Sequence, residues 1–261
     1  MKKALLAVAL LAAASGANAN TILAGSEQSL QSILDGITVG GPSSVNVHTD
    51  QADPDEVWTN TDSGISPALF VVEIAGNAST NSFGIYDENN TGLYLEIFSG
   101  SDTTGDDATF SILDDGSVLV NHATALQNGA DINDITASII NGDTLYDTGM
   151  DFSTGNFGFY LATASNGTFY SIEDDNAAGN DQMVAYQGKG DLVNIAGQNK
   201  SWTSGGWILA FEDVLISNGS DQDYNDLVVM VESTQPVSEP ATLALFGLGL
   251  AGLGMARRRK S

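Results

Sequence analysis

The sequence predicts an all-β fold, an antiparallel β-sandwich or jelly roll with one short N-terminal helix. Short runs rich in β-branched and aromatic residues follow one another along most of the chain, and clusters of Asn, Asp, Gly and Ser separate them. This is the pattern of strands and turns. No long helical pattern lies between the runs, which favours antiparallel pairing over helical crossovers. The expected strands cover residues 44–48, 68–75, 83–87, 93–98, 108–113, 117–121, 156–163, 167–172, 182–186, 207–212 and 226–232.

The segment 26–34 has helical periodicity instead, and Ser26 is placed to cap its first turn. Its apolar stripe consists of Leu30, Ile33 and Leu34. The Asp35-Gly36 pair should end this helix, because glycine commonly follows the last helical turn.

Residues 1–19 have the pattern of a secretory signal peptide. A pair of lysines precedes the apolar run 4–14, and the small residues Ala17-Asn18-Ala19 form an A-x-A cleavage site. The apolar run is too short to span a bilayer permanently. We therefore expect signal peptidase to release a mature chain that begins at Asn20, outside the inner membrane.

Residues 238–261 form a three-part tail. Ser238-Glu239-Pro240 precedes the uncharged run 241–256, which predicts a transmembrane helix slightly shorter than the usual span. Positive charge stays on the cytoplasmic side, so the end of the chain should be cytoplasmic and everything before the helix external. The basic cluster consists of Arg257, Arg258, Arg259 and Lys260.

This tail resembles a PEP-CTERM sorting signal. Glu239 and Pro240 match the Pro-Glu-Pro signature of that family, and Ser238 stands where the first proline would be. The resemblance implies that an exosortase processes the tail and that the protein reaches the cell envelope or the extracellular matrix. The chain thus divides into a signal peptide (1–19), an acidic β domain (20–237) and a sorting tail (238–261).

The β domain is very acidic. Its only basic side chains, other than histidine, are Lys189 and Lys200, while it carries 32 of the 33 carboxylates, all but Glu239, for a formal charge of −30. Such a domain excludes nucleic acid as a partner, because binding it depends on Lys and Arg at the phosphates. Such a charge implies cations, either diffuse counterions or bound divalent metal, or else adaptation to salty surroundings.

Several enzyme classes are excluded or find no support. The chain has no cysteine, so disulfides, thiol catalysis and thiolate zinc sites are absent. The two histidines, His48 and His122, lie in no metal-binding or triad motif, and there is no G-x-S-x-G. Carboxylate pairs for glycoside hydrolysis are too numerous to single one out. We expect a protein that is not an enzyme.

The loop between the last two expected strands carries the strongest site pattern. Its side-chain oxygens alternate in the way that Ca²⁺ favours, and the end of the preceding strand adds Glu212 or Asp213. An EF-hand is excluded, because Asp226 occupies the glycine position and Glu232 lies far along an extended strand. The alternative is a solvated, Asx-rich turn without metal. The candidate calcium ligands are Glu212, Asp213, Asp221, Asp223, Asn225 and Asp226.

The same stretch carries a second resemblance. The run Phe211-Glu212-Asp213, followed by the motif DQDYNDLV at 221–228, is similar to the end of the bacterial domain-of-unknown-function family 4114. Residues 156–232 resemble that family best. The resemblance implies an extracellular β domain with an acidic metal-binding loop and no established activity.

A polysaccharide-binding module of the extracellular matrix is the alternative function. β-Sandwiches can present aromatic platforms, and Trp58, Trp202 and Trp207 are the candidates, although Trp207 has the alternation of a core residue. Three further acidic segments are weaker cation sites or solvated turns: 50–56, 102–107 and 174–181.

Overall fold

The computed structural model describes residues 22–23, 27–61, 64–73, 80–121, 137–140 and 143–237. Among these residues strands predominate, and all the strand pairings are antiparallel. The predicted all-β, antiparallel sandwich is therefore confirmed, and the described residues contain one short α-helix near the N-terminus. The predicted signal peptide and sorting tail lie outside the described residues.

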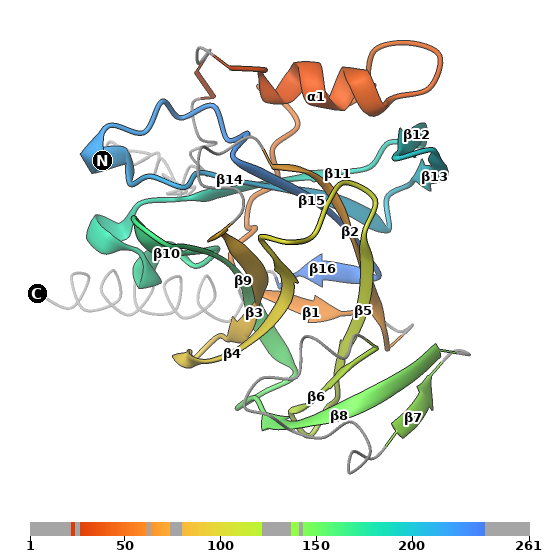
Figure 1. Cartoon of the computed structure of the whole chain (residues 1–261), viewed down its shortest axis with the longest axis vertical. Coiled ribbons are helices and arrows are strands. Elements are labelled where there is room, and N and C mark those ends of the chain that lie inside the picture. Colours follow the sequence, from red (N-terminus) through yellow and green to blue (C-terminus); the bar gives the residue numbers. More distant parts are fainter. Residues whose placement is uncertain are drawn as a thin grey trace, which may run out of the picture.

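Two sheets form the body of the domain (Figure 1). The larger sheet has the order β11 (Met183–Gln187), β14 (Gly206–Phe211), β15 (Leu227–Glu232), β2 (Ser66–Glu73), β5 (Asp107–Ile112), β6 (Ser117–Val120), β8 (Asp143–Asp151) and β7 (Ala137–Ile140). The smaller sheet has the order β16 (Thr234–Pro236), β1 (Trp58–Asn60), β9 (Asn156–Thr163), β3 (Ser82–Asp87) and β4 (Asn90–Ser99), and β10 (Gly167–Tyr170) also pairs with β9. A separate hairpin consists of β12 (Asp191–Ile195) and β13 (Gln198–Trp202).

The main core lies between the two sheets and is rich in aromatic side chains. Trp58 of β1 packs edge-on against Trp207 of β14, with ring centroids 5.2 Å apart. Phe83 of β3 stacks on Phe159 of β9 at 5.6 Å. The Trp58–Trp207 contact joins the two sheets, whereas Phe83 and Phe159 belong to neighbouring strands of the smaller sheet. Large aromatic rings of this kind bury much apolar surface at once.

A second core lies on the other face of β11, β14 and β15, beneath helix α1 (Leu30–Ile37). Figure 1 shows the helix lying over these strands at one end of the domain. The three strands are consequently covered on both faces, which explains why the run Leu227–Glu232 is apolar almost without alternation. The side chains that face the helix are Val184, Tyr186, Ile208, Ala210, Val228 and Met230.

The helix boundaries differ from the prediction. Ser29, rather than Ser26, caps the helix by accepting a hydrogen bond from the Ser32 N–H, and Ser26 lies outside the described residues. The helix also continues through Asp35-Gly36 to Ile37. Asp35 supports this last turn, because its carboxylate accepts hydrogen bonds from Gln31 and from the backbone of Ser43.

The predicted strand 44–48 is wrong. These residues form a loop against α1 in which Val45 and Val47 are buried. The Gln31 side chain takes the place of a neighbouring strand, because it donates to the Val45 carbonyl and accepts from the Val47 N–H. The alternating residues therefore do bury Val45 and Val47, but the backbone of this segment bonds to a helix side chain and not to another strand.

The other ten expected strands are present with shifts of one to a few residues at their ends. The prediction omitted β1, β7, β8, β12, β13 and β16. The missed hairpin of β12 and β13 is mostly polar, and β1 and β16 have three residues each, so neither pair carries a strong strand pattern.

Gly84 in the centre of β3 gives a direct test of the packing between strands. A Cβ atom there would lie 1.9 Å from the Leu95 carbonyl oxygen, so we expect Gly84→Ala to lower the free energy of unfolding by about 3 kcal/mol. Gly36 in α1 is the matched control, since a Cβ there meets nothing within 4 Å and alanine should stabilise the helix by up to about 1 kcal/mol. Urea denaturation measures both changes, and equal midpoints for the two variants would contradict this packing.

Candidate metal site in the loop between β14 and β15

The candidate site lies where β14 ends and the chain returns toward β15. Glu212 follows the last residue of β14 and is only 1% exposed. Its two carboxylate oxygens accept hydrogen bonds from the Tyr224 N–H, at 2.6 Å, and from the Ser220 hydroxyl. Glu212 thus ties the loop back onto the strand that precedes it.

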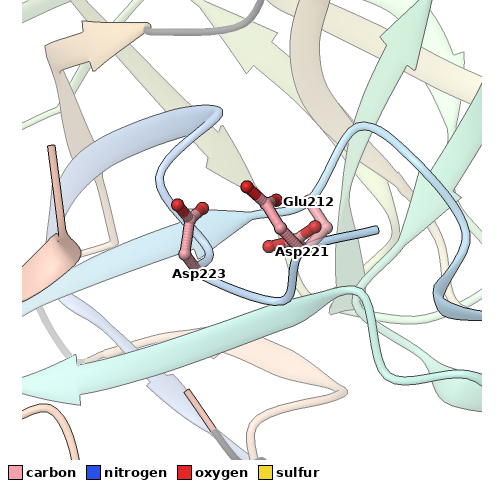
Figure 2. A group of neighbouring side chains, drawn as sticks. All are labelled: Glu212, Asp221 and Asp223. Carbon is pink, nitrogen blue, oxygen red and sulfur yellow. The ribbon is translucent and has the colours of Figure 1, made fainter. Parts of the chain in front are cut away.

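Three carboxylates converge at this point. Each of Glu212, Asp221 and Asp223 offers one oxygen, and these oxygens lie within 4.8 Å of one another. Figure 2 shows the three side chains gathered between the strand end and the returning loop. Two oxygens bound to the same Ca²⁺ at about 2.3–2.6 Å are at most about 5 Å apart, so the cluster has the dimensions of a calcium site.

The cluster is buried on one side and open on the other. Glu212 and Asp223 are buried, whereas Asp221 is exposed to solvent. An ion could therefore enter from the side of Asp221 and keep water molecules among its ligands, as Ca²⁺ commonly does.

The remaining predicted ligands lie beside this cluster and brace it. Asn225 donates hydrogen bonds from its amide to the Asp223 carboxylate and to the Gln28 carbonyl, both at 2.8 Å. Asp226 accepts from the Asp213 N–H at 2.8 Å, which closes the base of the loop. Asp213 and Asp226 contribute no carboxylate oxygen to the cluster of three, and Asn225 contacts it through its hydrogen bond to Asp223.

Backbone conformation gives the loop its shape. Gln222 and Tyr224 both have positive φ angles, of 57° and 50°, which are uncommon for residues other than glycine. The Gln222 carbonyl also accepts a hydrogen bond from Leu23, near the start of the described chain. These constraints hold Asp221 and Asp223, the neighbours of Gln222, close to Glu212.

The electrostatics of the loop favour uptake of positive charge. Burial, followed by the charge of Asp221, raises the pKa of Asp223 to about 6. Burial and the neighbouring carboxylates raise the pKa of Asp226 to about 8. Burial also raises the pKa values of Glu212 and Asp213. A bound divalent cation would relieve the same desolvation and repulsion that otherwise hold protons on these groups.

Sequence reasoning missed two residues of the loop. Tyr224 is 1% exposed, and its hydroxyl donates to the Asp181 carbonyl at 2.9 Å while its N–H holds Glu212. Ser220 holds the second oxygen of Glu212 and also accepts from the Gln222 N–H. An aromatic residue inside an acidic turn is the signal that could have pointed to Tyr224, because such a ring needs a core to pack against.

The proposed tryptophan platform is wrong. Trp58 and Trp202 are fully buried and Trp207 is 6% exposed, so none can stack on a sugar ring at the surface. All three are core residues, which is the usual place for such large apolar side chains.

The acidic turn at 102–107 is explained by local hydrogen bonds. Asp102 accepts from the Ser99 N–H, and Asp106 accepts from the Thr103 N–H. These are turn contacts, as expected for aspartate in such positions, and they need no metal.

Comparisons with known families agree with both resemblances in the sequence. Residues 152–234 match the family model described as Domain of unknown function (DUF4114), and residues 236–260 match the PEP-CTERM protein-sorting motif. No curated protein and no solved structure matches the chain. The sorting motif indicates an exported protein of the cell envelope that an exosortase processes. The description of neither family names an enzymatic activity.

The candidate site lies entirely within the segment that matches the family of unknown function. Within the part of the chain that the structure describes, no helix has the length and apolar character needed to cross a membrane. The apolar run 241–256, where the sequence predicts a transmembrane helix, lies outside that part.

Proposed function

We propose that this protein is an exported, calcium-binding β domain without enzymatic activity, which acts at the bacterial cell surface or in the extracellular matrix. One Ca²⁺ binds Glu212, Asp221 and Asp223 and fixes the loop between β14 and β15. Signal peptidase removes residues 1–19, and an exosortase processes the tail after a transient stage in the inner membrane with the C-terminus in the cytoplasm.

The convergence of the three carboxylates carries this proposal. Like charges at this separation repel unless a proton or a cation lies between them. The two lysines of the β domain are poorly placed to help, since Lys189 pairs with Asp50 at 2.6 Å and Lys200 lies on β13. Oxygen donors from carboxylates suit a hard cation such as Ca²⁺.

The hydrogen bonds of Glu212 and Asp223 support a structural role. Both carboxylates hold backbone or side-chain groups of their own loop, and both are buried. A carboxylate that already organises its loop is suited to binding an ion that rigidifies this loop, rather than to exchanging protons with a substrate.

Calcium binding to the intact protein, measured by calorimetry in concentrated KCl, tests the site. Asp221→Asn should weaken calcium binding at this loop at least about tenfold, because it removes one charge from the ligand set. Asp106→Asn is the matched control, as its carboxylate serves a distant turn. Equal calcium affinity in wild type and Asp221→Asn would refute the proposal.

The processing of both ends is tested separately by mass spectrometry of protein recovered outside the cell. We expect a chain that begins at Asn20 and lacks the basic cluster 257–260, and Ser238→Pro should be processed at least as completely. Replacement of Glu239 by alanine should retain the tail in the membrane fraction. External protein that still carries Arg257 would contradict exosortase processing.

Polysaccharide binding remains the second candidate function, and one surface feature favours it. Tyr94 is 42% exposed and lies edge-on to Tyr160, at the rim of a hollow of about 180 Å³ that Glu96 and Tyr170 also line. Tyrosine beside polar groups is a common surface for sugar rings. Tyr94→Ala should then abolish retention on immobilised matrix polysaccharide, and unchanged retention would exclude this hollow.

A further inference from the structure

A second group of acidic residues lies along the outer edge of β11. The segment before β1 runs along this edge, where Gln51 pairs with Tyr186 and the Ala52 N–H donates to the Ala185 carbonyl at 2.8 Å. The Asp55 carboxylate lies close to the Ala185 backbone N–H, which acts to lower its pKa. Asp55 is thereby held against the strand that Asn180 and Asp181 precede.

One oxygen of Asp55 has no hydrogen-bond partner although the residue is 7% exposed. Buried polar groups in folded proteins are nearly always paired, so this orphaned oxygen requires an explanation. Asp87, by contrast, is a buried carboxylate in this protein whose two oxygens both accept hydrogen bonds. It is 2% exposed, and its oxygens accept from the Asn89 N–H and from both the N–H and the hydroxyl of Ser153.

The surroundings of Asp55 supply more acceptors and negative charge. Burial and, next in order, the Asp181 carboxylate raise the pKa of Asp55 well above its ordinary value, and Asp53 and Glu56 act in the same direction. The side-chain oxygen of Asn180, the residue before Asp181 in the chain, is also buried without a partner. A proton can join two of these oxygens at most, whereas a divalent cation takes six or more.

We propose that a second Ca²⁺ binds between Asp55 and Asp181, with the Asn180 side-chain oxygen as a neutral ligand. This ion fastens the segment before β1 to the start of β11. The site needs no ligand of the first one, but the two are neighbours, because the Tyr224 hydroxyl donates to the Asp181 carbonyl while the Tyr224 N–H holds Glu212.

The number of calcium ions bound per molecule tests this second site. Equilibrium dialysis of the intact protein measures it in concentrated KCl, which suppresses diffuse binding. We expect two ions for wild type and one for Asp55→Asn. Asp87→Asn is the matched control, and it should keep both ions because its carboxylate is fully paired. Asp55→Asn should also melt at the same or a higher temperature than wild type without calcium, since an amide relieves the repulsion.

Asp181→Asn provides a second, less buried variant and should likewise retain one ion, so the result does not depend on the folding of Asp55→Asn. Undiminished calcium in either folded variant would overturn the second site. The two sites fail independently. Loss of an ion in Asp55→Asn but not in Asp221→Asn would leave the second site standing and refute the loop site.

Discussion

Saturating calcium should raise the free energy of unfolding of this protein by about 2.7 kcal/mol per site when the ion is present at a hundred times its dissociation constant. The physical reason for this stabilisation is clearest at the loop site. Without an ion, Glu212, Asp221 and Asp223 hold three carboxylate oxygens within 4.8 Å of one another. Binding removes their repulsion in the folded state, whereas the unfolded chain keeps them apart.

The measurement is a set of thermal and urea unfolding curves in concentrated KCl, with and without calcium. High monovalent salt saturates the screening of a domain with a formal charge of −30 and isolates the specific effect. Asp223→Asn should remove most of the increment that belongs to the loop, and Asp106→Asn should keep it. If both variants retain the whole increment, the loop is only an Asx-rich turn.

Strands with a strong local pattern were predictable from the sequence. The predicted ends of β14 and β15 were correct to within one residue. These strands lie between the two cores, so their runs are almost entirely apolar, and polar turns flank them. The residues 44–48 have an equally good alternation, yet their partner is the Gln31 side chain. A pattern within a short segment cannot reveal that a helix side chain will satisfy its backbone.

Of the acidic residues discussed above, some could be predicted from the local sequence and others could not. The acidic residues of the loop were found from their alternation, and the choice between Glu212 and Asp213 depended on where β14 ends. The structure ends the strand at Phe211 and brings Glu212 to Asp221 and Asp223. By contrast, the approach of Asp55 to Asp181 follows from a chain segment that runs along an edge strand, which local sequence does not encode.

Without calcium, the protein should lose stability as the pH rises from 5 to 8. The reason lies in Asp226, whose pKa burial and nearby carboxylates raise from 3.8 to about 8, and in Asp223, whose pKa is raised to about 6. A carboxyl group with a raised pKa in the folded state stabilises the fold fully below its unfolded pKa. That contribution is lost as the pH rises through the folded pKa.

The loss should amount to about 3 kcal/mol for Asp226 between pH 5 and 8, at about 1.4 kcal/mol per pKa unit and with a reduction for its partial exposure. Urea denaturation in the presence of EGTA measures it. Calcium should counter the loss and bind more tightly as the pH rises, because protons compete for the same carboxylates.

Asp226→Asn should remove the steepest part of this pH dependence, since an amide does not ionise. Asp115→Asn is the control, because hydrogen bonds from Ser117 lower the pKa of Asp115, and its titration is complete below this pH range. A calcium-free wild type whose stability is constant or rises between pH 5 and 8 would show that the loop carboxylates are not held in the buried, mutually repelling arrangement described above.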